Sequence, residues 1–269
     1  MAIQFLFAFV IASVCSVKAP DSCGVEINKI TPQEALDGWR LLWDGKTLDG
    51  WVGVKEKFQK PPTKGWRIED GILTVLPIAR ITENGKWEML PKEKRIGGGG
   101  DIVTKEVFED FLFKFDFRLT HAANSGIKYF YNENIDSATC VEYQILHNAH
   151  PDASKGVGGN RKAASLYDIF ASNADKLLKG EGQWNTGMIV SQGGKIEHWL
   201  NGVKVLQYDR NSDEYRKGVE KSKYAKLGKA ADGSSKPWGT STQGRILIQD
   251  HTDSTVSYRN LKIKVLSKK

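Results

Sequence analysis

The residues of this chain best suited to proton transfer lie in two short stretches where polar side chains adjoin apolar ones. Glu142 and Gln144 alternate with valine, tyrosine and isoleucine, while Gln249 and His251 follow the run Ile-Leu-Ile. Because successive side chains of a β-strand point to opposite faces, each pair should lie opposite the apolar set. A carboxylate and an imidazole can transfer protons, and amides hydrogen-bond to hydroxyl groups. The two patterns predict a sheet face that binds a hydroxyl-rich ligand and moves its protons.

A lysine and a second acid adjoin these pairs. If Ile127 and Tyr129 belong to the core, Lys128 points to the same outer face as Glu142. Asp250 falls in the inward phase, where it could fix the surroundings of His251. Acid, amide, imidazole and amine would then share one face. Each residue taken alone is equally consistent with an ordinary polar position on a solvated sheet, and the sequence does not establish that the strand ends converge.

Histidines in a predicted loop raise the question of a metal. His147 and His150 lie near Asp152, but their spacing matches no strong metal-binding signature. We therefore predict no cofactor and keep a divalent metal as the alternative. His121 and His198 are expected to be structural. The glycine-rich runs lack the lysine and the strand-to-helix setting of a phosphate loop, and no Gly-x-Ser-x-Gly nucleophile motif occurs.

Short strands separated by glycine, asparagine and aspartate turns must position these side chains. The strongest pattern runs from Phe111 to Leu119, where phenylalanine alternates with other residues and requires one buried face. Further strands are expected at 139–146, 183–190, 195–200, 203–208, 244–249 and 255–266. Segments 55–64, 78–100, 147–163 and 209–243 are long enough to form rim loops, where binding residues gather. The pattern predicts an all-β fold, a jelly-roll sandwich of two antiparallel sheets.

Composition and charge narrow the class of protein. The 269 residues are 40% hydrophobic and 26% charged, as in an ordinary globular protein. Much of the formal charge of +7 comes from a basic stretch at 214–236, which we interpret as a solvated loop. No nucleic-acid motif accompanies it, so we predict no nucleic-acid partner.

The ends of the chain suggest three regions. The apolar run 3–17 is too short for a convincing membrane span and is typical of a signal peptide, here residues 1–19. Residues 20–38 form an extension with one helical turn capped at Thr31, and 39–266 form one sandwich. The mature chain should be exported to the periplasm or beyond the cell, without a transmembrane span. Lipidation at Cys15 is a weaker alternative. Cys23 and Cys140 could pair, the alternative being a free, buried Cys140.

An ordered set of motifs makes the sequence familiar. These are LWDGKTLDGW at 42–51, NSGIKYF at 124–130, VEYQIL at 141–146, GNR at 159–161, QWN at 183–185, WLNG at 199–202, QDH at 249–251 and YRNLKI at 258–263. Together they resemble the 3-keto-disaccharide hydrolase family, which has a concanavalin A-like jelly roll. The resemblance covers nearly all of residues 39–266. One departure is His147, where relatives often carry aspartate.

The resemblance implies a carbohydrate substrate oxidised at the 3-position of a sugar ring. A 3-keto group acidifies the hydrogen at C2, so the C1 oxygen can leave by elimination, after which water can add. Glu142 and His251 would be base and acid, in either order. Lys128 or Arg161 would stabilise the enolate charge. The residues expected to bind substrate are Asn124, Gln144, Asn185, Gln249 and Asp250, with Trp184 or Trp238 stacking on the sugar. The alternatives are a non-catalytic carbohydrate-binding module and a laminin-G-like adhesion domain.

Overall fold

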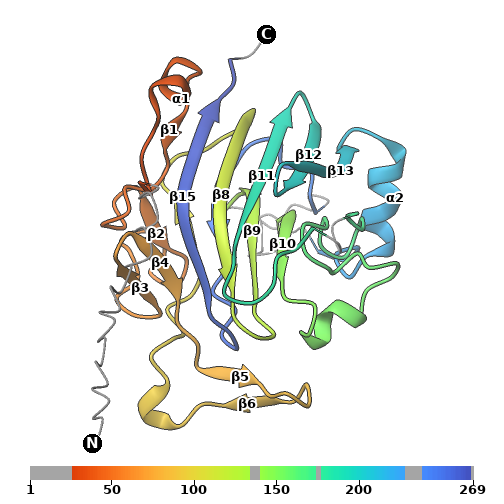
Figure 1. Cartoon of the computed structure of the whole chain (residues 1–269). Coiled ribbons are helices and arrows are strands. Elements are labelled where there is room, and N and C mark those ends of the chain that lie inside the picture. Colours follow the sequence, from red (N-terminus) through yellow and green to blue (C-terminus); the bar gives the residue numbers. More distant parts are fainter. Residues whose placement is uncertain (1–25, 134–139, 174–176, 228–237, 268–269) are drawn as a thin grey trace, which may run out of the picture.

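Two antiparallel β-sheets packed face to face form the body of the molecule (Figure 1). The computed structural model describes residues 26–133, 140–173, 177–227 and 238–267. The eight-stranded sheet runs in the order β13 (Val203–Asp209), β12 (Lys195–Leu200), β11 (Trp184–Gln192), β8 (Phe111–Leu119), β15 (Val256–Val265), β4 (Ile72–Val75) and β3 (Trp66–Glu69), with β1 (Arg40–Leu41) paired to β15. The five-stranded sheet runs β10 (Glu142–Leu146), β9 (Asn124–Tyr131), β14 (Arg245–Ile248), β7 (Ile102–Thr104) and β2 (Trp51–Gly53). The predicted all-β sandwich is confirmed.

Short elements lie outside the two sheets. A separate hairpin, β5 (Ala79–Ile81) with β6 (Trp87–Met89), projects below them in Figure 1. In the described ranges the α-helices are α1 (Pro32–Leu36) and α2 (Asp213–Lys221), and the 3₁₀ turns are η1 (Lys92–Lys94) and η2 (Pro151–Ser154). The hairpin occupies part of a segment that the sequence pattern assigns to a rim loop.

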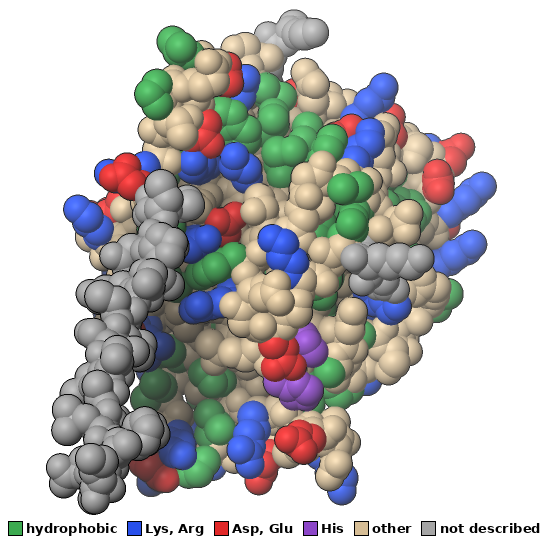
Figure 2. All heavy atoms as spheres, in the orientation of Figure 1, with side chains coloured by type: hydrophobic (Ala, Val, Ile, Leu, Met, Phe, Trp, Pro, Cys, Tyr) green, Lys and Arg blue, Asp and Glu red, His purple; other side chains and the backbone are tan. Residues whose placement is uncertain are grey.

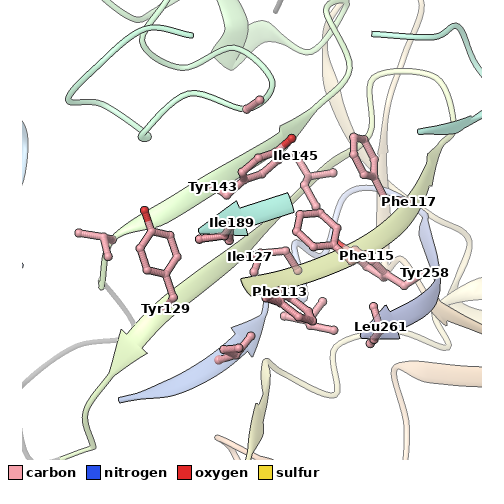
Figure 3. Close-up of a cluster of buried hydrophobic side chains, with 14 of the residues drawn as sticks. Phe113, Phe115, Phe117, Ile127, Tyr129, Tyr143, Ile145, Ile189, Tyr258 and Leu261 are labelled. Atoms are coloured by element: carbon pink, nitrogen blue, oxygen red, sulfur yellow. The ribbon is translucent and has the colours of Figure 1, made fainter. Parts of the chain in front are cut away.

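Alternate phenylalanines of β8 make the centre of the core. Exposure alternates along this strand, and Phe113, Phe115 and Phe117 are fully buried. The ring of Phe115 meets that of Tyr143 from β10 edge-on, with centroids 5.3 Å apart, which joins the two sheets (Figure 3). Burying one such ring favours folding by about 1.5–3 kcal/mol. This packing fixes the phase of β10, and therefore which of its side chains face away from the core.

Helix α2 lies in the segment 209–243, which the sequence pattern assigns to a loop. Ser212 caps the helix by accepting the backbone N–H of Tyr215, whose ring is buried. Asp213 and Glu214 follow in the first turn, where negative charge favours the helix dipole. A serine cap followed by acidic residues is a standard helix start, so the loop prediction is wrong for this part of the segment.

The N-terminal segment is fastened to the eight-stranded sheet. Asn28 and Asn260 exchange hydrogen bonds between backbone N–H groups and side-chain oxygens, at 2.6 and 2.8 Å. The predicted cap at Thr31 is present, and Glu34 completes a capping box with it. Although partial burial opposes ionisation, the ion pair with Lys262 and neighbouring hydrogen bonds lower the pKa of Glu34 to about 2.

Several expectations fall on residues outside the described ranges. These are the signal peptide at 1–19, lipidation at Cys15 and the pairing of Cys23 with Cys140. Cys140 itself is a free thiol, and burial raises its pKa to about 12. Within the described residues, no helix has both the length and the apolar character needed to cross a membrane.

Candidate functional site

A cavity of about 310 Å³ opens on the outer face of the five-stranded sheet. Strands β9 and β10 contribute Asn124, Lys128, Glu142 and Gln144, and the segment after β14 contributes Gln249 and His251. Loops complete the lining with Tyr167, Lys223, Tyr224 and Leu227. The structure therefore brings together, in one cavity, the acid, amide, imidazole and amine groups that strand phase places on one face.

Glu142 and Lys128 lie directly opposite each other in the ladder between β10 and β9. Both are buried, with 5% and 6% of their surface exposed. Burial raises the pKa of the Glu142 carboxyl, against the attraction of Lys128. Burial also disfavours a charged Lys128, but the carboxylates of Glu142 and Asp101 outweigh it and raise the pKa of this lysine. The site thus holds a carboxylate with a higher proton affinity than usual, as a general base near neutral pH requires.

The Glu142 carboxylate occupies space that a glycine leaves free. A Cβ atom on Gly126, in β9, would lie 1.9 Å from Oε1 of Glu142. With its amide oriented to satisfy its hydrogen bonds, Gln144 donates to the same oxygen at 2.9 Å and to the carbonyl of Ser125 at 3.2 Å. Gly126 and Gln144 together set the position of the carboxylate, one by its missing side chain and the other by a donated hydrogen bond.

His251 takes its orientation from Asp253. Its Nδ1 lies 2.7 Å from Oδ1 of Asp253, and the other oxygen of that carboxylate lies 3.4 Å from Nε2 of His150. Burial opposes protonation of His251, but the bond to Asp253 prevails and raises the pKa of the imidazole. Burial would also raise the pKa of Asp253, but hydrogen bonds from both histidines hold it far below its usual value. Asp253 therefore favours a protonated His251 and leaves Nε2 of that ring for a ligand.

Asp250 does not take the place that the sequence suggests. Its Oδ2 accepts the backbone N–H of Gly100 at 2.7 Å, and its buried Oδ1 has no partner among the described residues. Burial raises the pKa of this carboxyl. Asp250 is not part of the cavity lining, and the contact that fixes His251 comes from Asp253. The prediction that Asp250 orients His251 is wrong, because the chain turns after β14 and brings the later acid to the ring.

Two tyrosines and a lysine form the loop side of the cavity. The ammonium of Lys223 lies 4.3 Å from the ring centroid of Tyr167 and 5.1 Å from that of Tyr224. Trp238 stacks behind Tyr224 at 4.2 Å with the rings 6° from parallel. From the sequence, Trp238 is expected to stack on a sugar. Its side chain is only 4% exposed, and its position instead supports Tyr224 in the wall of the cavity. Sequence reasoning missed Lys223 because it stands in a basic stretch that we interpreted as a solvated loop.

Arg161 supports this loop side and does not line the cavity. Its guanidinium pairs with Asp168 at 2.6 Å and with Asp152 at 3.1 Å. Asp168 in turn accepts the backbone N–H of Lys223 at 2.8 Å, and Asp152 accepts the hydroxyl proton of Tyr167. The predicted contact of Arg161 with an enolate is therefore not supported by its position, since two carboxylates already engage its charge.

Trp184 and Asn185 belong to the other sheet. They stand on β11, where the guanidinium groups of Arg118 and Arg259 lie 4.7 and 4.2 Å from the ring centroid of Trp184. Asn185 is fully buried, and its side-chain oxygen accepts a hydrogen bond from Asn201 at 2.9 Å. The structure does not bring these two predicted substrate-binding residues to the cavity, because a local sequence motif does not reveal which sheet its strand joins.

Two groups of histidine and carboxylate side chains have the spacing of metal ligands. Their members are His150, His251 and Asp253 at the cavity, and His121, His147 and Glu181 near the end of β8. Within each group the potential ligand atoms lie within 4.8 Å of one another. Histidine and acidic side chains also gather low on the face shown in Figure 2. His147, His150 and Asp152, the alternative metal ligands considered from the sequence, do not form one such group, because the two histidines fall into different groups.

Hydrogen bonds at the histidine rings disfavour a metal in either group. Nδ1 of His150 accepts the backbone N–H of Asp152 at 3.0 Å, and Nδ1 of His147 accepts that of Ala149 at 3.2 Å. A neutral ring that accepts at Nδ1 carries its proton on Nε2, where a metal would need a lone pair. We interpret both groups as hydrogen-bonded networks. His198, expected to be structural, is buried and bonded to the hydroxyl of Tyr129 at 2.9 Å.

Comparisons with known proteins agree with the motifs of the sequence. Residues 38–264 match the family described as 3-keto-alpha-glucoside-1,2-lyase-like domains. The chain is 31% identical over 245 residues to a 3-keto-disaccharide hydrolase of Bacteroides thetaiotaomicron, covering 86% of this chain and 79% of the relative. Two candidate glycosyl hydrolases of Parabacteroides distasonis have similar solved structures. One has a TM-score of 0.67 and 27% identity, covering 90% of this chain and 100% of its own. The other has a TM-score of 0.58 and 26% identity, covering 85% and 99%.

Proposed function

This chain belongs to the family of 3-keto-alpha-glucoside-1,2-lyase-like domains, and on that basis we propose that it cleaves 3-keto glycosides by elimination. Glu142 removes the hydrogen from C2 as a proton, the C1–C2 double bond forms, and the bond from C1 to the glycosidic oxygen breaks. His251 gives a proton to the leaving oxygen. The products are an unsaturated keto sugar and an alcohol, and later addition of water to the double bond gives the hydrolysis product.

The observation that carries this proposal is the buried Glu142 carboxylate opening into a polar cavity beside His251. Its raised pKa suits a base that accepts a proton from carbon, and the raised pKa of His251 suits an acid. Glu142 is the only carboxylate among the described residues that line the cavity. Ordinary retaining glycosidases use two carboxylates about 5–5.5 Å apart. A single lining carboxylate supports elimination over that mechanism.

Amide side chains in the cavity suit the remaining hydroxyl groups of a sugar. Asn124, Gln144 and Gln249 line it from three strands or strand ends, and each carries both a donor and an acceptor. A sugar hydroxyl is also both donor and acceptor, so such amides can pair with it in either direction. These residues would bind the ring and hold C2 against Glu142.

Incubating the purified protein with a 3-keto disaccharide and, separately, with its unoxidised parent tests the proposal. We expect cleavage of the keto substrate alone, and in heavy water a hydrolysis product that carries deuterium at C2. Deuterium placed at C2 of the substrate should slow turnover where proton removal limits the rate. Equal cleavage of the parent would contradict elimination, and binding of the keto sugar without cleavage would point to a binding module.

A further inference from the structure

Elimination from a 3-keto sugar places negative charge on the C3 oxygen while the C2 hydrogen leaves. A cation or hydrogen-bond donor at that oxygen is needed to stabilise the enolate, and in a water-poor site such a donor is worth far more than in bulk water. Lys128 and Lys223 are the lysines among the described residues that line the cavity. The two differ in their surroundings.

Lys128 is engaged by carboxylates of the protein. It lies opposite Glu142 in the strand ladder and is attracted by Asp101 as well. Its charge offsets the cost of burying these two acids. A lysine so placed would lose those interactions if its ammonium moved to a substrate oxygen. Its position suits the task of keeping Glu142 ionised and therefore basic.

Lys223 is held differently. Its backbone N–H donates to Asp168 at 2.8 Å, and Asp168 is itself fixed by Arg161 at 2.6 Å. This fixes the backbone at the mouth of the cavity, while the ammonium lies against the rings of Tyr167 and Tyr224. Aromatic faces attract a cation without accepting strong hydrogen bonds from it. The N–H donors of this ammonium therefore keep capacity for an oxygen of a ligand.

We propose that Lys223 is a catalytic residue whose ammonium donates a hydrogen bond to the C3 oxygen of the bound keto sugar and stabilises the enolate. The proposal rests on the elimination proposed above. The two lysines then have separate roles. Lys128 keeps the Glu142 carboxyl ionised, and Lys223 stabilises the negative charge that forms when Glu142 removes the proton. Arg161, through Asp168, is then a positioning residue for Lys223. No proton or electron pair is transferred to Lys223, which acts only through its charge and its hydrogen bond.

The electrostatics agree with this division. Desolvation against the cavity lining lowers the pKa of Lys223, although Glu142 opposes the change and part of the side chain is exposed to solvent. The charged ammonium thus gains less from the protein groups around it than the ammonium of Lys128 does. An oxygen that becomes negative in the transition state supplies the missing partner, so the interaction strengthens as the reaction proceeds, which is the condition for catalysis.

Replacing Lys223 tests the proposal. Lys223→Met keeps the length of the side chain and removes its charge, so we expect kcat on a 3-keto disaccharide to fall by on the order of 100-fold, with a smaller change in KM. Lys223→Arg keeps a cationic donor and should retain a larger share of the rate. Lys221→Met, at the exposed end of α2, is the matched control and should leave the rate unchanged.

Exchange of the C2 hydrogen with heavy water gives a second measurement. It reports proton removal directly, and in Lys223→Met it should slow together with cleavage. If the wild-type protein does not cleave the keto substrate at all, the proposed function fails. If it does and Lys223→Met is equally fast, this inference alone fails. Trapping of substrate on Lys223 by borohydride, seen as added mass on that residue, would also overturn it in favour of a covalent iminium.

Discussion

The outer faces of the two sheets differ in what covers them. On β8, in the eight-stranded sheet, exposure alternates, and Lys114, Asp116 and Arg118 remain partly in contact with solvent. Every residue of β9 and β10 is buried, including the charged Lys128 and Glu142. Burying a charge costs free energy unless it is paired, so charged side chains on a covered face require a compensating arrangement. Coverage, more than polarity, therefore distinguishes the sheet face that carries the cavity from the solvated face.

The same kinds of residue behave differently on the two faces. On the open face, Asp116 is saturated by its neighbours, accepting hydrogen bonds from Thr186, Arg259 and Asn260. On the covered face, Gln144 donates to Glu142 and His251 is bonded to Asp253, yet all three cavity-lining side chains still open into the cavity. A saturated network holds a sheet together, whereas the partly satisfied one keeps bonding capacity for a ligand.

The largest expected effect is that of Glu142→Gln. The amide keeps the shape of the side chain and loses its basicity, so turnover of a 3-keto disaccharide should fall at least about 100-fold. Binding, measured by calorimetry, should survive. On the open face of β12, Glu197→Gln is the matched control, because the Glu197 carboxylate accepts hydrogen bonds from Lys204 and Trp199 outside the cavity. If Glu142→Gln turned over substrate as fast as the wild type, the carboxylate of the covered face would be no more important for activity than that of the open face.

A smaller effect is expected from a single methyl group. Gly126→Ala would place Cβ against the Glu142 carboxylate, while Gly187→Ala on β11 would place it 2.5 Å from the Phe115 ring in the core. Both changes should destabilise the fold by about 1–3 kcal/mol in urea unfolding. Only Gly126→Ala should also reduce the activity of the folded protein, by on the order of 10-fold or more, because it displaces the base. Equal activity losses in the two variants would mean that stability alone explains them.

The third prediction concerns the pH behaviour of the covered face. Asp253→Asn removes the acid that raises the pKa of His251, so this pKa should fall, measured by NMR of the imidazole ring. His251 stabilises the fold below its unfolded pKa and loses this contribution as the pH rises through its raised folded pKa. Asp253 has a lowered pKa, so it stabilises the fold at pH values above its unfolded pKa. This contribution is lost as the pH falls through its folded pKa.

The two contributions overlap between roughly pH 4 and 6.5, the ordinary values of aspartate and histidine. The difference in unfolding free energy between wild type and Asp253→Asn should therefore be largest in this window and smaller at pH 8. A difference that is flat from pH 5 to pH 8 would show that the His251–Asp253 contact is not charge-dependent.

Strand phase was enough to predict the sandwich and the covered cavity face. Alternation in 111–119 fixed the core, and the same rule applied to 141–146 placed Glu142 and Gln144 outward. Local capping chemistry predicted the turn at Thr31. These features depend on neighbours along one strand or turn, which a single sequence displays directly.

The remaining parts of the site depend on contacts between distant segments. Lys223 is held at the cavity through its backbone N–H, which donates to Asp168, 55 residues away in sequence. Trp184 and Asn185 share the composition of a sugar-binding motif, but their strand joins the other sheet. Asp253 stands two residues beyond His251, where an alternating phase no longer applies after β14 ends. Such placements are decided by tertiary packing and leave no periodic signal.

The position of β15 has a consequence for the order in which the molecule is assembled. This strand comes after all the other described strands in the sequence, yet it lies inside the eight-stranded sheet, between β8 and β4, and also pairs with β1. In the pairing of β1 with β15, Arg40 lies opposite Ile263. Contacts between residues so far apart in the sequence close very long loops and form slowly. A ribosome must release residues 256–265 before the larger sheet can close. Until then the edge of β8 that pairs with β15 stays open, and an unpaired strand edge is prone to aggregation.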